Sequence, residues 1–316
     1  MMICIAHWLL TPFQHNSIGK VRSRPSSRSV RTRTHSSPSR ELGDMSQRMR
    51  DEARIWREKG RKARKECCYR ARLAEQSQRY EDMIALVNNV IEISSNADAE
   101  DESAELSVEE RNLFSVAYKS VVGKKRTSWR ALKVIRSKYE KYEKDDVHAS
   151  LVTKYIEKIE TEIVTLCSKV NELIDNSLSA RTKSHHGKVF FRKMAADYQR
   201  YLCEIFSGEL LKEAAEKSLM YYKLAAMYAD KNLHPTDPIR LGVALNFSVF
   251  YYETLRAPDR ACLLARTAFD DALAELDQLP EEHYTDSTIL LQLIRDNLQK
   301  WGKGDEYGPV VRNTMS

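Results

Sequence analysis

Residues that interrupt helices are scarce in this sequence. Its 316 residues include only 10 glycines and 8 prolines, and several of these fall in the first 45 or the last 15 positions. Because glycine and proline are the strongest local breakers of regular structure, the interior contains long segments that can remain helical. The scarcity of breakers predicts an all-α fold.

The sequence also lacks the segments that mark several classes of protein. No run of 18 apolar residues is present, so we predict no transmembrane helix. None of the six cysteines forms a CxxC pair, which is typical of the reduced thiols of an intracellular protein and not of a disulfide framework. We therefore expect a cytoplasmic protein, with the nucleus as an alternative location.

Recognisable catalytic or metal-binding spacings are absent as well. The segment GKKRTS at 123–128 lacks the upstream glycine of a P-loop, and no predicted strand precedes it. The adjacent His185 and His186 have no cysteine or histidine partners nearby in the sequence, and no Ser/His/Asp arrangement stands out. The sequence therefore predicts no enzyme, no metal site and no cofactor.

Positive charge is concentrated toward the N-terminal end. Residues 1–72 contain 18 Lys or Arg against 6 Asp or Glu, a net of +12, whereas the remainder contains 33 against 39, a net of −6. Residues 17–40 are rich in Arg and Ser and carry almost no large apolar side chains, so we predict that they are disordered. The chain accordingly divides into a disordered extension (1–60), a helical domain (61–302) and a flexible C-terminal tail (303–316).

The role of the basic extension stays open from the sequence. Its first ten residues are apolar but lack the positively charged n-region and the small-residue cleavage site of a signal peptide. The Arg- and Ser-rich, acid-poor segment after them is typical of an organelle transit peptide. Translation from Met45 or Met49 would remove most of it. Its charge also allows salt-dependent binding of nucleic acid through residues 17–72. We expect no nucleic-acid or membrane partner for the rest of the chain.

Hydrophobic periodicity predicts nine helices joined mostly by short loops. Their predicted residues are 46–72, 73–93, 107–142, 147–179, 187–207, 210–231, 238–256, 259–277 and 284–301. The segment SVEE at 107–110 is predicted to form a capping box, and Asp237 followed by Pro238 is a typical helix start. Because the connections are short, consecutive helices are expected to pack antiparallel.

One predicted helix concentrates Lys and Arg in the segment YKSVVGKKRTSWR at 118–130. Lys119 and Arg126 are seven residues apart and therefore lie on one face, and Arg130 follows Arg126 four residues later. Like charges at this spacing destabilise a helix unless an anion or a partner carboxylate offsets their repulsion. The pattern indicates either an anion-binding face or charges that are paired elsewhere in the fold.

Three other predicted helices mix polar and apolar residues on one face. These faces comprise Lys193, Asp197, Arg200, Tyr201 and Glu204 in helix 187–207, Asn246, Val249 and Glu253 in helix 238–256, and Leu290, Leu293, Asn297 and Trp301 in helix 284–301. A concave surface with a basic and an apolar side would suit an extended phosphorylated peptide, because Arg binds phosphate oxygens and Asn pairs with peptide backbone. Taken singly, each face is also typical of solvated charge or of plain core.

Five segments between Leu73 and Gly302 resemble the 14-3-3 family. They are RNLFSVAYKSVVGKKRTSWR, KVFFRKMAADYQRYLCEI, HPTDPIRLGVALNFSVFYYE, ACLLARTAFDDALAELD and DSTILLQLIRDNLQKW. The resemblance implies nine antiparallel helices, a cup-shaped protomer with an amphipathic groove, and a homo- or heterodimer. It also implies an adaptor that binds phosphoserine or phosphothreonine motifs of phosphorylated client proteins in signal transduction. The alternative is a helical scaffold whose partner binding does not depend on phosphate.

The resemblance assigns roles to residues at matching positions. The phosphate-binding positions are Lys119, Arg126, Arg200 and Tyr201, with Arg130 close by. The peptide-binding positions are the backbone clamps Asn246 and Asn297, the apolar wall of Leu245, Val249, Leu293 and Trp301, and the flanking Lys193 and Glu253. The dimer positions are Leu73, Ala74, Arg79, Asp82, Ser128, Tyr155, Lys158 and Glu162. Arg79 and Asp82 are expected to pair with Glu162 and Lys158 of the other subunit.

Two serines suggest regulation. Ser128 lies in KKRTSWR, a plausible site for a basophilic kinase, and its phosphorylation is expected to weaken dimers. The segment RTHSSP at 33–38 resembles the ligand motif that the 14-3-3 family prefers. If Ser36 is phosphorylated, the extension could occupy the groove of its own chain or of a second chain as an autoinhibitor, although any Arg- and Ser-rich segment produces such matches.

Overall fold

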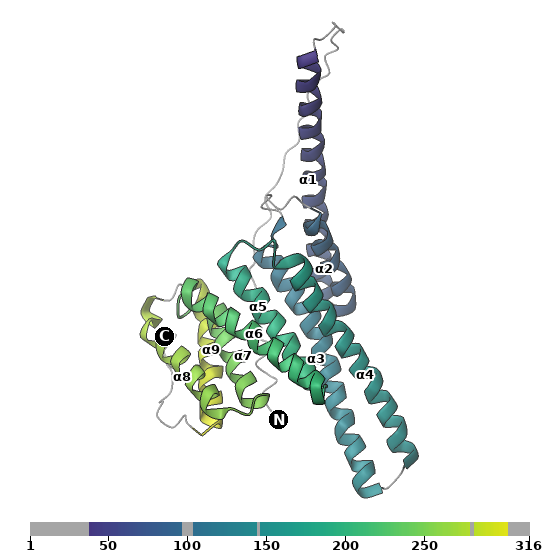
Figure 1. The fold of residues 1–316 in the computed structure, drawn as a ribbon, viewed down its shortest axis with the longest axis vertical. Coiled ribbons are helices and arrows are strands. Elements are labelled where there is room, and N and C mark those ends of the chain that lie inside the picture. The colour runs from purple at the N-terminus through teal and green to yellow at the C-terminus, as the bar shows by residue number, and fades with distance from the viewer. Residues whose placement is uncertain (1–37, 97–103, 144–145, 279–280, 303–316) are drawn as a thin grey trace. The chain divides into compact units, whose positions relative to one another are not determined.

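The computed structural model describes residues 38–96, 104–143, 146–278 and 281–302, and within these ranges it contains nine α-helices and no strand (Figure 1). The helices are α1 (Pro38–Gln76), α2 (Tyr80–Ser95), α3 (Val108–Lys138), α4 (Asp146–Leu173), α5 (His185–Cys203), α6 (Gly208–Asn232), α7 (Pro238–Glu253), α8 (Pro258–Ala274) and α9 (Glu281–Lys300). The predicted all-α fold is confirmed. None of the described helices is both long and apolar enough to cross a membrane.

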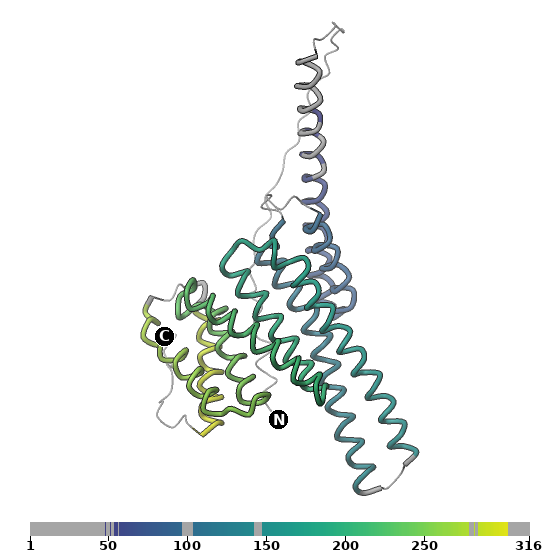
Figure 2. Tube along the Cα trace, viewed as in Figure 1, coloured from purple at the N-terminus to yellow at the C-terminus, as the bar shows by residue number. Residues whose placement is uncertain are grey.

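The chain divides into two compact units, residues 1–66 and 67–316. In the first unit the described residues 38–66 form one uninterrupted part of α1, so that helix starts before the predicted residue 46. Ser36 and the segment around it lie outside the described residues. The second unit contains the end of α1 and all of α2 to α9, and Figure 2 follows the chain through it.

The predicted helix over 73–93 is in fact two helices separated by a turn. Gln78 has a left-handed backbone with φ of 57°, and the Arg79 amide donates to the carbonyl of Ala74 over 2.8 Å. Ala74 and Tyr80 on the two sides of the turn are both buried in the same core. No glycine or proline marks this turn in the sequence, so burial of both residues decides it.

The main core of the second unit joins the end of α1 to α2, α3, α4 and α5. Its fully buried side chains include Phe114 and Tyr118 of α3, Ile163 of α4, and Phe191 and Tyr198 of α5. A separate cluster joins α7, α8 and α9 through Leu241, Leu245, Phe269, Leu291 and Ile294. Helix α5 packs against α3, α4, α6 and α7, so four helices surround it.

Two helix starts have the predicted caps. The Ser107 hydroxyl accepts a hydrogen bond from the Glu110 amide over 3.2 Å, while the Glu110 carboxylate accepts one from the Ser107 amide over 2.8 Å. The Asp237 carboxylate accepts hydrogen bonds from the amides of Ile239 and Arg240, and Pro238 occupies the first turn of α7. The predicted capping box and N-cap are confirmed.

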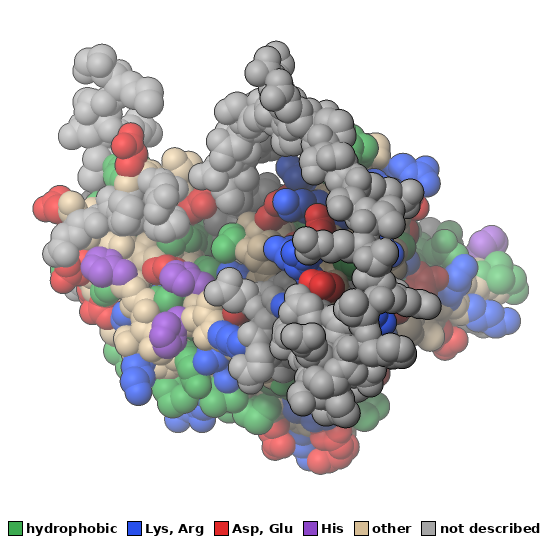
Figure 3. All heavy atoms as spheres, turned by 90° about the horizontal axis from the view of Figure 1, so that it is seen from above, with side chains coloured by type: hydrophobic (Ala, Val, Ile, Leu, Met, Phe, Trp, Pro, Cys, Tyr) green, Lys and Arg blue, Asp and Glu red, His purple; other side chains and the backbone are tan. Residues whose placement is uncertain are grey.

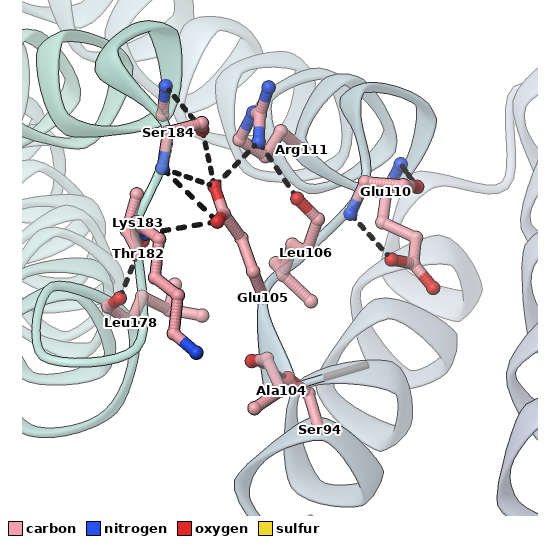
Figure 4. A network of polar contacts seen from close by, with 12 residues as sticks. Ser94, Ala104, Glu105, Leu106, Glu110, Arg111, Leu178, Thr182, Lys183 and Ser184 are labelled. Atoms are coloured by element: carbon pink, nitrogen blue, oxygen red, sulfur yellow. Dashed lines mark hydrogen bonds and ion pairs between the residues drawn. The ribbon is translucent and has the colours of Figure 1, made fainter. Parts of the chain in front are cut away.

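A carboxylate ties the start of α3 to the start of α5 (Figure 4). Glu105 accepts hydrogen bonds from the backbone amides of Lys183 and Ser184, from the Ser184 hydroxyl, and from Arg111 over 3.4 Å. Partial burial opposes ionisation of Glu105, but these hydrogen bonds and the Arg111 charge outweigh it and lower the pKa of its carboxyl. Glu105 thereby fixes the two helices that carry the basic residues.

Candidate functional site

Arginines from two helices meet at one aromatic ring. The guanidinium of Arg126, on α3, lies 4.0 Å from the centre of the Tyr201 ring, and that of Arg200, on α5, lies 4.9 Å from it. Both arginines are buried, with 7% of each residue exposed. The electron-rich face of an aromatic ring attracts cations, so Tyr201 offsets part of the cost of placing two buried positive charges together. The structure thus brings Arg126, Arg200 and Tyr201 into one site.

A second group of contacts forms around Glu204, at the end of α5. Arg126 donates to the two oxygens of this carboxylate, in one case through Nε over 3.2 Å, and Arg130 Nη2 donates over 2.9 Å. Burial alone would raise the pKa of Glu204, but the neighbouring guanidinium groups lower it. Glu204 is therefore ionised and holds two of the cationic side chains of α3.

A third group surrounds Asp197, which is fully buried. Its carboxylate accepts hydrogen bonds from the Tyr222 hydroxyl over 2.5 Å, from Asn246 Nδ2 over 2.9 Å and from Lys193 Nζ over 2.8 Å. Arg200 Nε in turn donates to the Tyr222 hydroxyl over 3.2 Å. A buried charge is stable only when it is paired and hydrogen-bonded, and Asp197 meets this requirement with groups from α5, α6 and α7. It orients Lys193 and Asn246, and it holds Arg200 both through Tyr222 and through an ion pair with Nη2 over 3.8 Å.

Lys119 completes the group of positive charges on α3. Burial lowers the pKa of Lys119 to about 8, and the nearby charges of Lys193 and Arg200 act in the same direction while Asp197 opposes them. The ammonium is therefore mostly protonated at neutral pH but lacks a full complement of negative charge around it. We call Lys119, Arg126, Arg130, Lys193 and Arg200 together the cationic cluster.

The hydroxyl of Tyr201 keeps its proton across the physiological range and can donate a hydrogen bond. Burial raises the pKa of Tyr201, and the Asp197 carboxylate raises it further despite the opposing charges of Arg200 and Arg126. Ammonium, guanidinium and hydroxyl donors therefore converge on one site.

On the face shown in Figure 3, Lys and Arg side chains lie directly beside Asp and Glu side chains, so positive charge does not form a uniform patch there.

The predicted peptide-binding residues lie on α5, α7 and α9, except Trp301, which directly follows α9. Lys193 belongs to the cationic cluster, and Asn246 adjoins the cluster because both side chains contact Asp197. Leu245, Leu293 and Trp301 pack with the apolar cluster of α7, α8 and α9. The Trp301 ring also stacks on Tyr252, with ring centres 4.6 Å apart. The remaining members of this set are Val249 and Asn297, which are buried, and Glu253, which is half-buried.

Four of the eight predicted dimer residues lie on α3 and α4, and the other four lie on α1, α2 and the turn between them. Ser128, Tyr155, Lys158 and Glu162 line one hollow of about 220 Å³. Leu73 and Tyr155 are exposed, with 48% and 55% of their surface accessible. Residues that contact a second subunit must be exposed in the single chain, and these two residues meet that condition. Ala74 instead is buried in the core of its own chain.

The predicted interface charges have partners within the chain. Arg79 Nε lies 2.5 Å from Asp82 Oδ2, and Lys125 Nζ lies 2.6 Å from Glu162 Oε2. Pairing of Arg79 and Asp82 with a second subunit would therefore exchange existing contacts instead of forming new ones between unpaired groups.

Tyr222 is the site residue that sequence reasoning missed. It lies on α6, outside every segment that suggested a function, yet its hydroxyl joins Asp197 to Arg200. The sequence placed Asp197 and Glu204 on the polar face of the predicted helix, but it did not show that these carboxylates pair with the basic residues. The spacing of Asp197, Arg200, Tyr201 and Glu204 at i, i+3, i+4 and i+7 was the available signal, since alternating opposite charges on one face indicate internal pairing.

Comparison with known proteins identifies close relatives. The 14-3-3 protein family model matches residues 70–302. The chain is 52% identical over 239 residues to 14-3-3-like protein GF14 chi of Arabidopsis thaliana, covering 76% of this chain and 86% of that protein. It is 51% identical over 238 residues to a 14-3-3-like protein of Pisum sativum and 50% identical over 238 residues to 14-3-3 protein 6 of Solanum lycopersicum. These two matches cover 75% of this chain and 88% and 90% of the respective relatives.

Proposed function

The chain belongs to the 14-3-3 family, whose members are adaptor and regulatory proteins that act on protein partners, and we propose that it binds phosphoserine and phosphothreonine motifs of client proteins. By binding such motifs it would change the activity, localisation or assembly of its clients in signal transduction, in the cytoplasm or the nucleus. The observation that carries the proposal is the meeting of Arg126 and Arg200 on the ring of Tyr201, with Lys119 beside them.

The donors of this site suit a phosphate ester in number and charge. A phosphate monoester carries a charge of about −1.5 to −2 at neutral pH and has three strong acceptor oxygens. Arg126 and Arg200 offer planar guanidinium donors, Lys119 adds a compact charge, and the Tyr201 hydroxyl adds a neutral donor. An arriving phosphate would supply the negative charge that Lys119 lacks, which would raise its pKa and keep it protonated.

The polypeptide on each side of the phosphate would lie along α7 and α9. Asn246 and Asn297 would pair with its backbone amide and carbonyl groups, which an amide side chain can do without reading the sequence. Leu245, Val249, Leu293 and Trp301 would form the apolar wall of the groove, with Lys193 and Glu253 beside it. Asn246 already donates to Asp197, so its orientation would be fixed before the peptide arrives.

Dimerisation is the second part of the proposal. The face that carries Leu73, Ser128 and Tyr155 would meet the same face of a second 14-3-3 chain, identical or related. Arg79 and Asp82 would exchange their internal contact for Glu162 and Lys158 of the partner subunit. Exposed ion pairs contribute only about 0–1 kcal/mol each, so the apolar contacts would supply most of the interface stability.

A titration with matched peptides tests the phosphate site. A phosphoserine peptide should bind while its unphosphorylated twin does not, and Arg200→Ala should weaken binding of the phosphopeptide by at least about tenfold, because one charge-assisted hydrogen bond is lost. Arg192→Ala is the matched control, since Arg192 is on the same helix and also lies over a tyrosine ring, that of Tyr228 at 4.4 Å.

The alternative function predicts a different result from the same titration. A helical scaffold that binds partners without phosphate would bind both peptides equally, and Arg200→Ala would leave both affinities unchanged. That outcome would refute the phosphate-binding proposal.

A further inference from the structure

The two carboxylates of the site differ in how far they are buried. Asp197 is fully buried, and its side chain contacts Lys193, Tyr222 and Asn246 from three helices. Glu204 lies at the end of α5, with 21% of its side chain exposed. Asp197 is therefore a fixed part of the fold, whereas Glu204 lies at the accessible edge of the site.

Glu204 occupies the donors that an incoming anion needs. It accepts from Nε and Nη2 of Arg126, which is the edge of a guanidinium that binds a carboxylate or a phosphate with two parallel hydrogen bonds. It also accepts from Arg130 over 2.9 Å. An anion that binds to Arg126 must share these donors with Glu204 or displace it.

Whether an anion can compete with Glu204 for Arg126 depends on the charge of that anion. A ligand with one negative charge offers Arg126 no more charge than Glu204 already provides, so displacing Glu204 brings no electrostatic gain. A dianion brings twice the charge and can bind Lys119, Arg126 and Arg200 while Glu204 keeps its contact with Arg130. Five cationic groups and two carboxylates leave three net positive charges in the site, enough to accept a dianion.

We infer that Glu204 is a built-in competing anion that makes the site select doubly charged phosphate esters over singly charged anions of any shape. This inference rests on the proposed function and adds a specificity-determining residue to it. Glu204 acts through Arg126 and Arg130 and is in that sense a positioning residue. Its position also predicts that the site discriminates between ligands of different charge, which orientation of the two arginines alone would not produce.

The groups around Glu204 predict that the ligand phosphate controls how phosphopeptide affinity changes between pH 5 and pH 7. The charged or titratable groups near it are Arg126 and Arg130 of α3, Cys167 of α4, and Arg200, Tyr201 and Cys203 of α5. Burial raises the pKa of Cys167 to about 12 and that of Cys203 to about 11, so neither thiol loses its proton below pH 7. Between pH 5 and pH 7 the ligand phosphate, with its second pKa near 6, is the group expected to titrate.

A set of four peptides separates charge from shape. The peptides carry serine, phosphoserine, O-sulfoserine or glutamate at the same position. Sulfate esters have the tetrahedral shape and three terminal oxygens of a phosphate ester, but only one negative charge. The full-length protein should bind the phosphoserine peptide at least about tenfold more tightly than the sulfoserine peptide, because losing one charge removes the advantage over Glu204. Equal affinity for these two peptides would overturn the inference without any mutation.

Glu204→Gln tests the residue itself. This variant should bind the sulfoserine and glutamate peptides about tenfold more tightly than the unmodified protein does, while its affinity for the phosphoserine peptide changes much less. The ratio of its affinities for the phosphoserine and sulfoserine peptides should therefore be smaller than in the unmodified protein. Its phosphopeptide affinity should also fall by a smaller factor between pH 7 and pH 5. Glu204→Asp keeps the charge and should retain most of the selectivity.

The matched control is Glu209→Gln. Glu209 pairs with Lys212 over 3.0 Å at the start of α6, and 74% of its side chain is exposed. This control should leave all four affinities unchanged. If Glu204→Gln weakens phosphoserine and sulfoserine binding by the same factor, Glu204 only orients Arg126 and the inference is wrong. If the unmodified protein binds the serine and phosphoserine peptides equally, the proposed function fails and the inference fails with it.

Discussion

The hydroxyl of Tyr222 lies between two charged groups, which makes Tyr222→Phe a sharp test of how the site is held together. This hydroxyl donates to Asp197 over 2.5 Å and accepts from Arg200 over 3.2 Å, and the residue is fully buried. Phenylalanine keeps the ring, which stacks on Phe247 with centres 5.1 Å apart, and removes only the oxygen. The change therefore isolates the two hydrogen bonds from the packing.

The size of the effect follows from what each partner retains. Asp197 keeps its contacts with Lys193 and Asn246, but it stays fully buried with one donor fewer. A hydrogen bond to a charged group contributes about 1.5–3 kcal/mol, so we expect a loss of about 2 kcal/mol in the free energy of unfolding. For a domain of this size that loss corresponds to a fall in Tm of about 4–8 °C.

Binding should change less than stability. Arg200 keeps its charge and its contact with the Tyr201 ring, so Tyr222→Phe loosens its orientation without removing it. We expect the phosphopeptide affinity to fall about three- to tenfold, the range typical of lost preorganisation at a single side chain.

Thermal unfolding and peptide titration on the same samples check both numbers. The control is Tyr221→Phe, since the neighbouring hydroxyl donates to Asp175 over 2.8 Å at the exposed surface. Water can replace this exposed hydrogen bond, so no buried group is left without a partner and the control should stay close to the unmodified protein. If the two variants have the same Tm and the same affinity, Tyr222 does not hold Arg200 as we argue.

Three further predictions concern other parts of the chain. Gly187→Ala should lower Tm, because the new Cβ would lie 2.6 Å from Thr182 and 2.9 Å from Glu105, whereas Gly123→Ala meets nothing within 4 Å and should raise the free energy of unfolding by up to about 1 kcal/mol. Phosphopeptide affinity should fall about tenfold as pH rises from about 7.5 to 9, because Lys119 loses its proton through its lowered pKa of about 8, and Lys119→Arg should flatten this profile in the same titrations. Ser128→Glu should shift dimers toward monomers in sedimentation, since it places a charge on the proposed interface. Ser137→Glu is the control, because Ser137 is exposed further along α3, and it should leave the dimer unchanged. An unchanged dimer for both variants would refute the role of Ser128.

Helix starts were predictable because their signals are local. The Ser107 capping box and the Asp237 cap involve residues two or three positions apart, so their residue types can be recognised in the sequence without knowledge of the tertiary structure. The turn at Gln78 was not predictable in the same way. It contains no glycine or proline, and it exists because Ala74 and Tyr80 are both buried in one core.

The site shows the same division between local and long-range information. Helical spacing places Lys119 and Arg126 on one face of a helix, and the helical pattern of 187–207 places Arg200 and Tyr201 on another helix, so both groupings were predictable from the sequence. The pairing of Arg126 with Glu204, 78 residues away, and the link that Tyr222 makes between Asp197 and Arg200 could not be predicted without the packing of the helices. Helical spacing is set by hydrogen bonds between residues four apart, whereas the pairing of distant charges depends on how α3, α5 and α6 pack, which is decided by apolar burial across the whole unit.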